Sequence, residues 1–269
     1  SVGFDPAYIE EERRLGLQKG TQQTSGGLDL SQFSLQYHDQ RGGLPANATR
    51  KVGDGFEEVS IPAATRLPQA DKSDLISITL LDEWAQSTFP GTTHLNRIQS
   101  EVFPVAYNTN ENMLICAPTG AGKTNIAMLA FLHLVKSHVV DGVLDKAGLK
   151  AIYVAPMKAL AQEVVTKSSE RLAPLSLEVR EFAADMQLTR AEIEQSQLIV
   201  TTPEKWDVVT RKGGDGTLAT MVKLIIIDEV HLLADERGAV IESIVARTQR
   251  YIESSQQMIR LVGLSATLP

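Results

Sequence analysis

From Leu80 onward, short apolar runs alternate with stretches in which apolar residues recur every three or four positions. The runs have the length of buried strands, and the longer stretches have the periodicity of amphipathic helices. This alternation is typical of a parallel sheet with helices on both faces, so the pattern predicts an α/β domain. Its predicted strands are residues 113–117, 151–155, 198–201, 224–227 and 261–264. Its predicted helices are residues 81–89, 95–107, 123–139, 158–172, 203–211 and 239–254.

The first part of the chain lacks this alternation. Residues 1–80 are expected to form an extended N-terminal segment ahead of the α/β domain, which is predicted to span residues 81–269. Gly, Ser, Thr and Gln are frequent in residues 20–34, whereas short apolar pieces occur at residues 33–37 and 56–61. This composition leaves two alternatives open, a loose linker and a segment that packs against a neighbouring domain.

Composition and charge narrow the class of protein. Apolar residues make up 43% of the chain, which excludes wholesale disorder. The chain carries 33 acidic and 26 basic residues, a net charge of −7, so a polybasic membrane surface or a DNA-wrapping protein is not expected. The single cysteine, Cys116, cannot form an intrachain disulfide, and it lies in a predicted strand together with expected core residues. With no apolar run of the roughly 18–20 residues that a span needs, we expect no membrane association and a location in the nucleus, the cytoplasm or both.

A Gly-rich loop follows the first predicted strand and opens the next helix. Glycines let backbone N–H groups turn toward an anion, and the N-terminal end of the helix favours negative charge there. In such a loop Lys123 would reach the β- and γ-phosphates of ATP, and the Thr124 hydroxyl would bind Mg²⁺. Ala117 stands where the strict pattern has Gly, so a plain Gly-rich turn remains an alternative. The predicted ATP-binding residues of the loop are Ala117, Pro118, Thr119, Gly120, Ala121, Gly122, Lys123 and Thr124.

Two carboxylates end the predicted strand at residues 224–227. Ligands of open parallel sheets bind at the carboxyl ends of the strands, which is where Asp228 and Glu229 lie. Asp228 is expected to hold Mg²⁺ through water, and Glu229 to orient or deprotonate the attacking water. Taken alone, the pair could also cap the helix that follows. Together with the Gly-rich loop, it predicts a site for hydrolysis of a nucleoside triphosphate.

Further motifs resemble those of superfamily-two helicases, in the order of that family. They are Phe89 with residues 95–100 (glutamine motif), 155–160 (motif Ia), 201–207 (motif Ib), 228–231 (DExH box) and 265–267 (SAT motif). Residues 202–212, 228–233 and 242–250 resemble the superkiller-like DExH helicases with tandem cassettes. That branch includes the helicases of signal-cointegrator, ribosome-quality-control and spliceosomal complexes. The resemblance implies a RecA-like P-loop NTPase fold, and a segment at residues 44–59 that packs on the helicase core.

The resemblance also implies roles for individual residues. Gln99 would read the adenine edge of ATP. Pro156, Lys158, Thr202 and Pro203 would line the track of a single strand of RNA or DNA, which is recognised through its backbone. The residues expected to couple the nucleotide to the strand are His231, Ser265 and Thr267. Each of these could instead be an ordinary capping or structural residue.

Two departures from the family pattern affect the expected activity. Ala183 and Ala184 replace a Thr-Gly pair, which puts one backbone contact to nucleic acid in doubt. The sequence also stops at Pro269, before motifs IV to VI and the second RecA-like domain with its arginine finger. The chain by itself is therefore expected neither to unwind duplexes nor to turn over ATP usefully. A parent protein would do both with ATP and Mg²⁺, in the 3′-to-5′ direction by resemblance.

Three functions compete for this sequence. The first is the ATP-binding half of a nucleic-acid helicase. The second is a catalytically silent cassette that serves as a scaffold or regulatory module, and the third is a phosphate-loop kinase or transporter ATPase. Intact Lys123, Thr124, Asp228 and Glu229 favour a working site, and the glutamine and SAT motifs have no place in the third class.

Overall fold

The computed structural model describes residues 48–62, 74–182, 189–211, 218–234 and 238–267. The chain divides into two compact units, Ser1–Pro68 and Gln69–Pro269. In the first unit, β1 (Thr49–Gly53) and β2 (Phe56–Ser60) form an antiparallel hairpin. Gly55, the second residue of the two-residue turn, has a φ of +81°, which glycine adopts without steric cost. The departure at residues 183–184 and the apolar piece at residues 33–37 lie outside the described residues.

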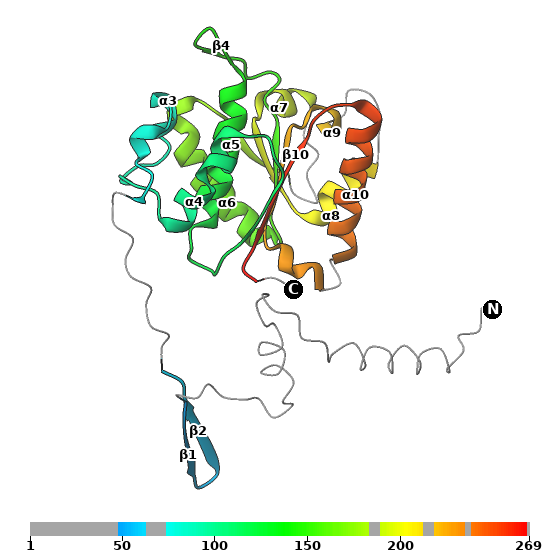
Figure 1. The fold of residues 1–269 in the computed structure, drawn as a ribbon. Coiled ribbons are helices and arrows are strands. Elements are labelled where there is room, and N and C mark those ends of the chain that lie inside the picture. Colours follow the sequence, from blue (N-terminus) through cyan, green and yellow to red (C-terminus); the bar gives the residue numbers. More distant parts are fainter. Residues whose placement is uncertain (1–47, 63–73, 183–188, 212–217, 235–237, 268–269) are drawn as a thin grey trace, which may run out of the picture. The chain divides into compact units, whose positions relative to one another are not determined.

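A six-stranded parallel sheet organises the second unit, in the order β3-β10-β9-β6-β8-β7 (Figure 1). The α/β class predicted from the sequence is thus confirmed. The strands are β3 (Met113–Cys116), β6 (Ala151–Val154), β7 (Val179–Phe182), β8 (Leu198–Thr201), β9 (Leu224–Ile227) and β10 (Arg260–Ser265). A separate small hairpin joins β4 (Val139–Val140) to β5 (Val143–Leu144).

Helices connect the strands and lie on both faces of the sheet (Figure 1). The α-helices are α3 (Glu83–Gln86), α4 (Arg97–Asn108), α5 (Lys123–Ser137), α6 (Lys158–Leu172), α7 (Arg190–Gln195), α8 (Pro203–Arg211), α9 (Leu218–Met221) and α10 (Gly238–Ser255). Short 3-10 turns are η2 (Ile78–Leu80), η3 (Ala173–Leu175) and η4 (Val230–Ala234). Within the described residues, no helix has both the length and the hydropathy of a membrane span.

The sheet separates two hydrophobic clusters. Alternate residues of a strand point to opposite faces, so Tyr153 joins the cluster with α4, α5 and α6, whereas Ile152 joins that with α8 and α10. The central strands β6, β8 and β9 are buried along their whole length. Burial on both faces explains why these strands are continuous apolar runs, and why their positions could be predicted.

The second unit begins before the boundary predicted at residue 81. Ile76 and Ile78 pack with the first cluster, and the Leu95 N–H donates to the Ile76 carbonyl at 2.8 Å. This stretch is a short turn with no helical or strand periodicity, so the hydrophobic pattern did not reveal it. The helix predicted at residues 81–89 is correspondingly short, because only Glu83–Gln86 are helical.

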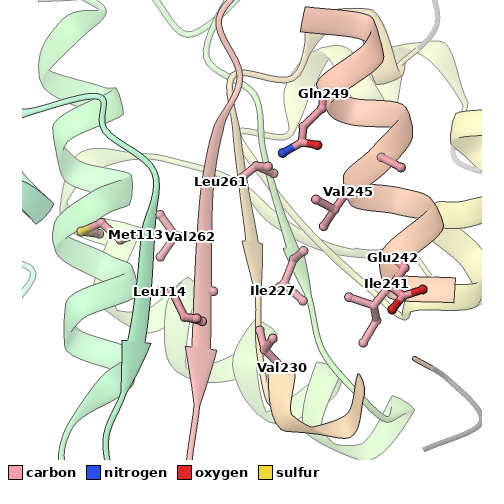
Figure 2. Close-up of a pocket in the computed structure, with 12 residues that line it drawn as sticks. Met113, Leu114, Ile227, Val230, Ile241, Glu242, Val245, Gln249, Leu261 and Val262 are labelled. Atoms are coloured by element: carbon pink, nitrogen blue, oxygen red, sulfur yellow. The ribbon is translucent and has the colours of Figure 1, made fainter. Parts of the chain in front are cut away.

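An apolar groove runs along the sheet between β3 and α10 (Figure 2). Strand β3 lies at the edge of the sheet, and Leu114 on its α10 side is 58% exposed. Cys116, two residues further along the strand, is also exposed. The expectation that Cys116 belongs to the core was therefore wrong, because an edge strand is covered on only one face here.

Candidate active site

The Gly-rich loop leaves the carboxyl end of β3 and enters α5. Because β10 lies between β3 and β9, the loop lies near the ends of the strands that carry the SAT and DExH motifs. The Ala117 N–H donates to the Ser265 carbonyl at 3.0 Å. The sheet order therefore brings the Gly-rich loop, the SAT motif and the DExH box together at the carboxyl ends of the strands. This is where ligands of parallel sheets bind.

Two glycines give this loop its shape. Gly120 and Gly122 have φ values of +83° and +87°, which favour glycine over other residues. A Cβ atom at Gly122 would collide with Nε2 of Gln99, so a side chain there would displace that amide. Gly122 is also the N-cap of α5 and supplies no capping side chain to its first turn. The N–H groups of this helix end thus suit an anionic ligand.

The lysine of the loop lies across it. Lys123 Nζ donates to the carbonyls of Ala117 at 2.8 Å and of Pro118 at 3.3 Å. The Thr124 side chain, one residue further along α5, is exposed. To bind phosphate, Lys123 would exchange two neutral carbonyl acceptors for charged oxygens, which accept stronger hydrogen bonds.

Gln99 is buried and braces the loop. At the start of α4, its backbone N–H donates to Asn96 Oδ1 and its Oε1 accepts from the Asn96 N–H, which together form a capping box. Its Nε2 donates to the Gly122 carbonyl at 3.1 Å, and Asn96 Nδ2 donates to the Ala121 carbonyl at 2.8 Å. Both ends of the Gln99 amide are thus used within the protein. Its contact with adenine stays a prediction.

Phe89, the upstream residue of the glutamine motif, packs beneath a half-buried arginine. The Arg171 guanidinium lies 4.8 Å from the centre of the Phe89 ring. It also donates to the Thr88 carbonyl and to Asn125 Oδ1, both at 2.9 Å. Arg171 therefore ties the glutamine-motif segment to the first turn of α5. This contact could not be predicted from the sequence, since the two partners of Arg171 lie 83 and 46 residues away along the chain.

Asp228 is held by hydrogen bonds on both carboxylate oxygens. Oδ2 accepts the Tyr153 hydroxyl at 2.7 Å, and Oδ1 accepts the Glu229 N–H at 2.9 Å. Burial, followed by the charge and hydrogen bond of Asp228 and the charge of Glu229, raises the pKa of Tyr153 well above its usual value. The phenol therefore stays protonated and serves as a donor at neutral pH.

Glu229 has a backbone conformation that is uncommon for a residue with a side chain. Its φ is +52°, and such values are enriched at functional sites. Its buried Oε2 has no hydrogen-bond donor among the described residues. The nearest imidazole nitrogen, Nδ1 of His231, lies 3.2 Å away but accepts the Ala266 N–H at 3.4 Å. A buried carboxylate oxygen without a donor is suited to accept a proton or a water hydrogen.

The residues predicted to couple the motifs lie together. The hydrogen bond from Ala266 to His231 joins the SAT segment to the DExH box. The Ser265 hydroxyl donates to the Thr267 carbonyl, which closes the SAT segment on itself. The Ser265 carbonyl in turn accepts from Ala117 in the Gly-rich loop. These bonds connect the three motifs, and a role in coupling stays a prediction.

The predicted nucleic-acid residues follow β6 and β8, further along the same sheet edge. Val154 pairs with Thr201 in these neighbouring strands, so the two loops that follow lie next to each other. Of the four residues, Pro156 and Pro203 are buried, Lys158 is exposed and Thr202 is half-buried. In this structure only Lys158 and Thr202 present side chains to a ligand, and their contact with nucleic acid stays a prediction.

The oxygen donors at the site suit Mg²⁺. No group of three or more His, Cys, Asp or Glu side chains within the described ranges could hold a metal by itself. Mg²⁺ is commonly bound by one or two protein oxygens together with phosphates and water. The Asp228 carboxylate and the Thr124 hydroxyl match this requirement.

Comparison with known proteins places the chain in a family. The family model of the DEAD/DEAH box helicases matches residues 96–269. The chain belongs to this family. Relatives include the DExH-box ATP-dependent RNA helicase DExH14 of Arabidopsis thaliana, 58% identical over 84% of this chain and 10% of that protein. The RQC trigger complex helicase SLH1 of Saccharomyces cerevisiae is 54% identical over 89% of this chain and 12% of its own length.

A further relative confirms the branch that the motifs predicted. Subunit 3 of the activating signal cointegrator 1 complex of Gallus gallus is 57% identical over 84% of this chain. The chain spans 10% of that protein's length. The resemblance to superkiller-like DExH helicases is thereby confirmed.

Solved helicase structures confirm the RecA-like fold. Mss116p bound to single-stranded RNA and AMP-PNP superposes with a TM-score of 0.60 at 18% identity, over 76% of this chain and 43% of that one. The DUF1998 helicase MrfA bound to DNA and AMPPNP has a TM-score of 0.54 at 20% identity, over 70% of this chain and 26% of that one.

Proposed function

We propose that this chain is the ATP-binding N-terminal half of an ATP-dependent helicase that unwinds RNA or DNA. The observation that carries the proposal is the hydrogen-bonded path from the Gly-rich loop through Ser265 and Ala266 to His231 of the DExH box. A path of this kind links the place where phosphates would bind to the carboxylates that would act on them. Family membership supports ATP as the nucleotide.

The roles of the site residues follow from their positions. The loop N–H groups and Lys123 would bind the phosphates of ATP, and Thr124 and Asp228 would hold Mg²⁺, which neutralises phosphate charge when bound. Glu229, whose Oε2 has no hydrogen-bond donor among the described residues and lies 3.2 Å from His231 Nδ1, would orient or deprotonate the attacking water. The products would be ADP and phosphate. Gln99, which already contacts Gly122, would transmit the binding of adenine to the loop.

The nucleic-acid strand would lie across the loops that follow β6 and β8. Lys158 offers a cation, and the start of α8 beside Thr202 offers the positive end of a helix dipole. Such contacts are made to phosphates and read no base sequence. His231, Ser265 and Thr267 would transmit the state of the nucleotide toward these loops. By resemblance, the full-length protein would translocate in the 3′-to-5′ direction.

The setting of the full-length protein is part of the same proposal. One relative is named as a subunit of the activating signal cointegrator 1 complex, and another as the helicase of the RQC trigger complex. We accordingly expect a multiprotein complex in the nucleus, the cytoplasm or both, with the second RecA-like domain of the same protein as the immediate partner. Residues 1–80 are proposed to pack on the helicase core.

An unwinding assay tests the proposal. The chain alone is expected not to separate a duplex with a 3′ overhang, since an arginine finger from a second domain typically contributes about 10³–10⁵-fold to turnover. A longer chain that includes the second RecA-like domain is expected to unwind it with ATP, and its Lys123→Ala variant is not. Unwinding by the chain alone would contradict the claim that unwinding requires the second RecA-like domain. A longer chain that binds ATP but never unwinds RNA or DNA would favour the silent cassette.

A further inference from the structure

Tyr153 lies deep in the sheet beside the DExH box. It is the third residue of β6 and only 4% exposed. Strand register pairs Tyr153 with Ile226 of β9, and Asp228 follows Ile226 by two positions on the same face. The hydroxyl of Tyr153 can therefore reach past the end of β9 to Asp228, although 75 residues separate the two along the chain.

The hydrogen bonds around Asp228 fix its orientation. Tyr153 donates to Oδ2 at 2.7 Å and the Glu229 N–H donates to Oδ1 at 2.9 Å. The Asp228 N–H donates to the Val154 carbonyl at 2.9 Å, which anchors the backbone of the same residue to β6. Rotation of the carboxylate would break at least one of these bonds. A neutral phenol also orients the carboxylate and leaves its negative charge in place. A lysine or arginine in the same position would cancel that charge.

We propose that Tyr153 is a positioning residue of the nucleotide site, which holds Asp228 in the orientation that binds Mg²⁺ with ATP. The inference rests on the proposed function, because it assigns the metal to Asp228. Tyr153 itself touches neither nucleotide nor metal in this scheme. Partners that orient a metal-binding side chain commonly contribute about 10–100-fold to metal affinity or activity.

The same chain contains a matched control. Tyr107 of α4 is 2% exposed, and its hydroxyl donates to Asp82 Oδ2 at 2.6 Å. This bond also joins a buried tyrosine to an aspartate, but Asp82 precedes α3 and pairs with Lys136 near the end of α5. Tyr107→Phe therefore removes the same chemical group away from the nucleotide site. A role of Tyr153 in stability alone would make the two variants alike.

The test compares ATP binding with and without the metal. Isothermal calorimetry on the whole chain measures the Kd for ATP in Mg²⁺ and again in EDTA, for wild type, Tyr153→Phe and Tyr107→Phe. Tyr153→Phe is expected to weaken binding about tenfold in Mg²⁺ and to leave binding in EDTA unchanged. Tyr107→Phe is expected to change neither value. Circular dichroism melting confirms that both variants, which keep the aromatic ring, are folded.

A double-mutant cycle shows whether Tyr153 acts through Asp228. In the Asp228→Asn background, Tyr153→Phe is expected to weaken Mg²⁺-dependent binding no further. Unchanged Mg²⁺-dependent binding by Tyr153→Phe, an equal loss in Tyr107→Phe, or additive losses in the double variant would each overturn the inference. A folded wild-type chain that binds no ATP would overturn the proposed function and this inference with it.

Discussion

Glu229→Gln in the full-length protein is expected to lower ATP hydrolysis about 10²–10⁴-fold while ATP binding is retained. The Glu229 backbone has a positive φ, and its buried Oε2 has no hydrogen-bond donor in the part of the chain that the structure describes, so this oxygen is suited to accept a proton. Glutamine keeps the shape but cannot act as a base. Steady-state phosphate release with saturating nucleic acid measures the loss of hydrolysis. The Kd of a non-hydrolysable ATP analogue measures the binding, which is expected to be retained.

A second glutamate separates a catalytic effect from a general effect of charge. Glu163 lies on the exposed side of α6 and pairs with Lys167. Glu163→Gln removes the same charge from the same domain and is expected to leave hydrolysis within a factor of two. If Glu229→Gln hydrolysed ATP as fast as this control, Glu229 could not be the general base.

Arg260→Met is expected to lower the free energy of unfolding by about 3 kcal/mol, since it removes a buried side chain that donates to three carbonyls at once. Arg260 is 4% exposed and donates to the carbonyls of Val105, Ala106 and Glu111 at 2.8–3.0 Å. Two of these carbonyls, those of Val105 and Ala106, belong to the last turn of α4, where a cation is favourable. The Val105 carbonyl also accepts the Thr109 hydroxyl at 2.9 Å. Burial lowers the pKa of Arg260 to about 10, so the side chain is charged at neutral pH.

Urea unfolding followed by circular dichroism measures this effect. Arg250→Met is the control, because Arg250 is exposed on α10 and its replacement is expected to stay within about 0.5 kcal/mol of wild type. A loss of less than about 1 kcal/mol for Arg260→Met would mean that water or another side chain satisfies the carbonyls of α4 equally well.

The elements that could be predicted are those whose environment is uniform along their length. Strands β8 and β9 are buried on both faces, and their apolar runs end where the strands end. Edge strand β7 is Val-Arg-Glu-Phe, with its two middle residues half-buried, and it carries no such run. The hairpin of β4 and β5 has only two residues in each strand, too few for any periodicity.

The residues of the candidate site likewise divide into those that could be predicted from the sequence and those that could not. The Gly-rich loop and the DExH box could be found in the sequence because their chemistry resides in neighbouring residues. Tyr153, Arg171 and Arg260 could not, since their partners lie between 46 and 155 residues away along the chain and come close only in the folded domain. Two signals were present nonetheless: a tyrosine in a fully buried strand needs a partner for its hydroxyl, and Asn96 with Gln99 has the spacing of a capping box.

Binding of Mg²⁺ and ATP to the purified chain tests the central claim most directly. Calorimetry compares wild type with Lys123→Ala, after circular dichroism has shown that both are folded. We expect the wild type to bind ATP and the variant to bind about 10–100-fold more weakly, since Lys123 would donate charge-assisted hydrogen bonds to the phosphates. Equal binding by the two chains, or no binding by a folded wild type, would contradict an ATP site in this loop.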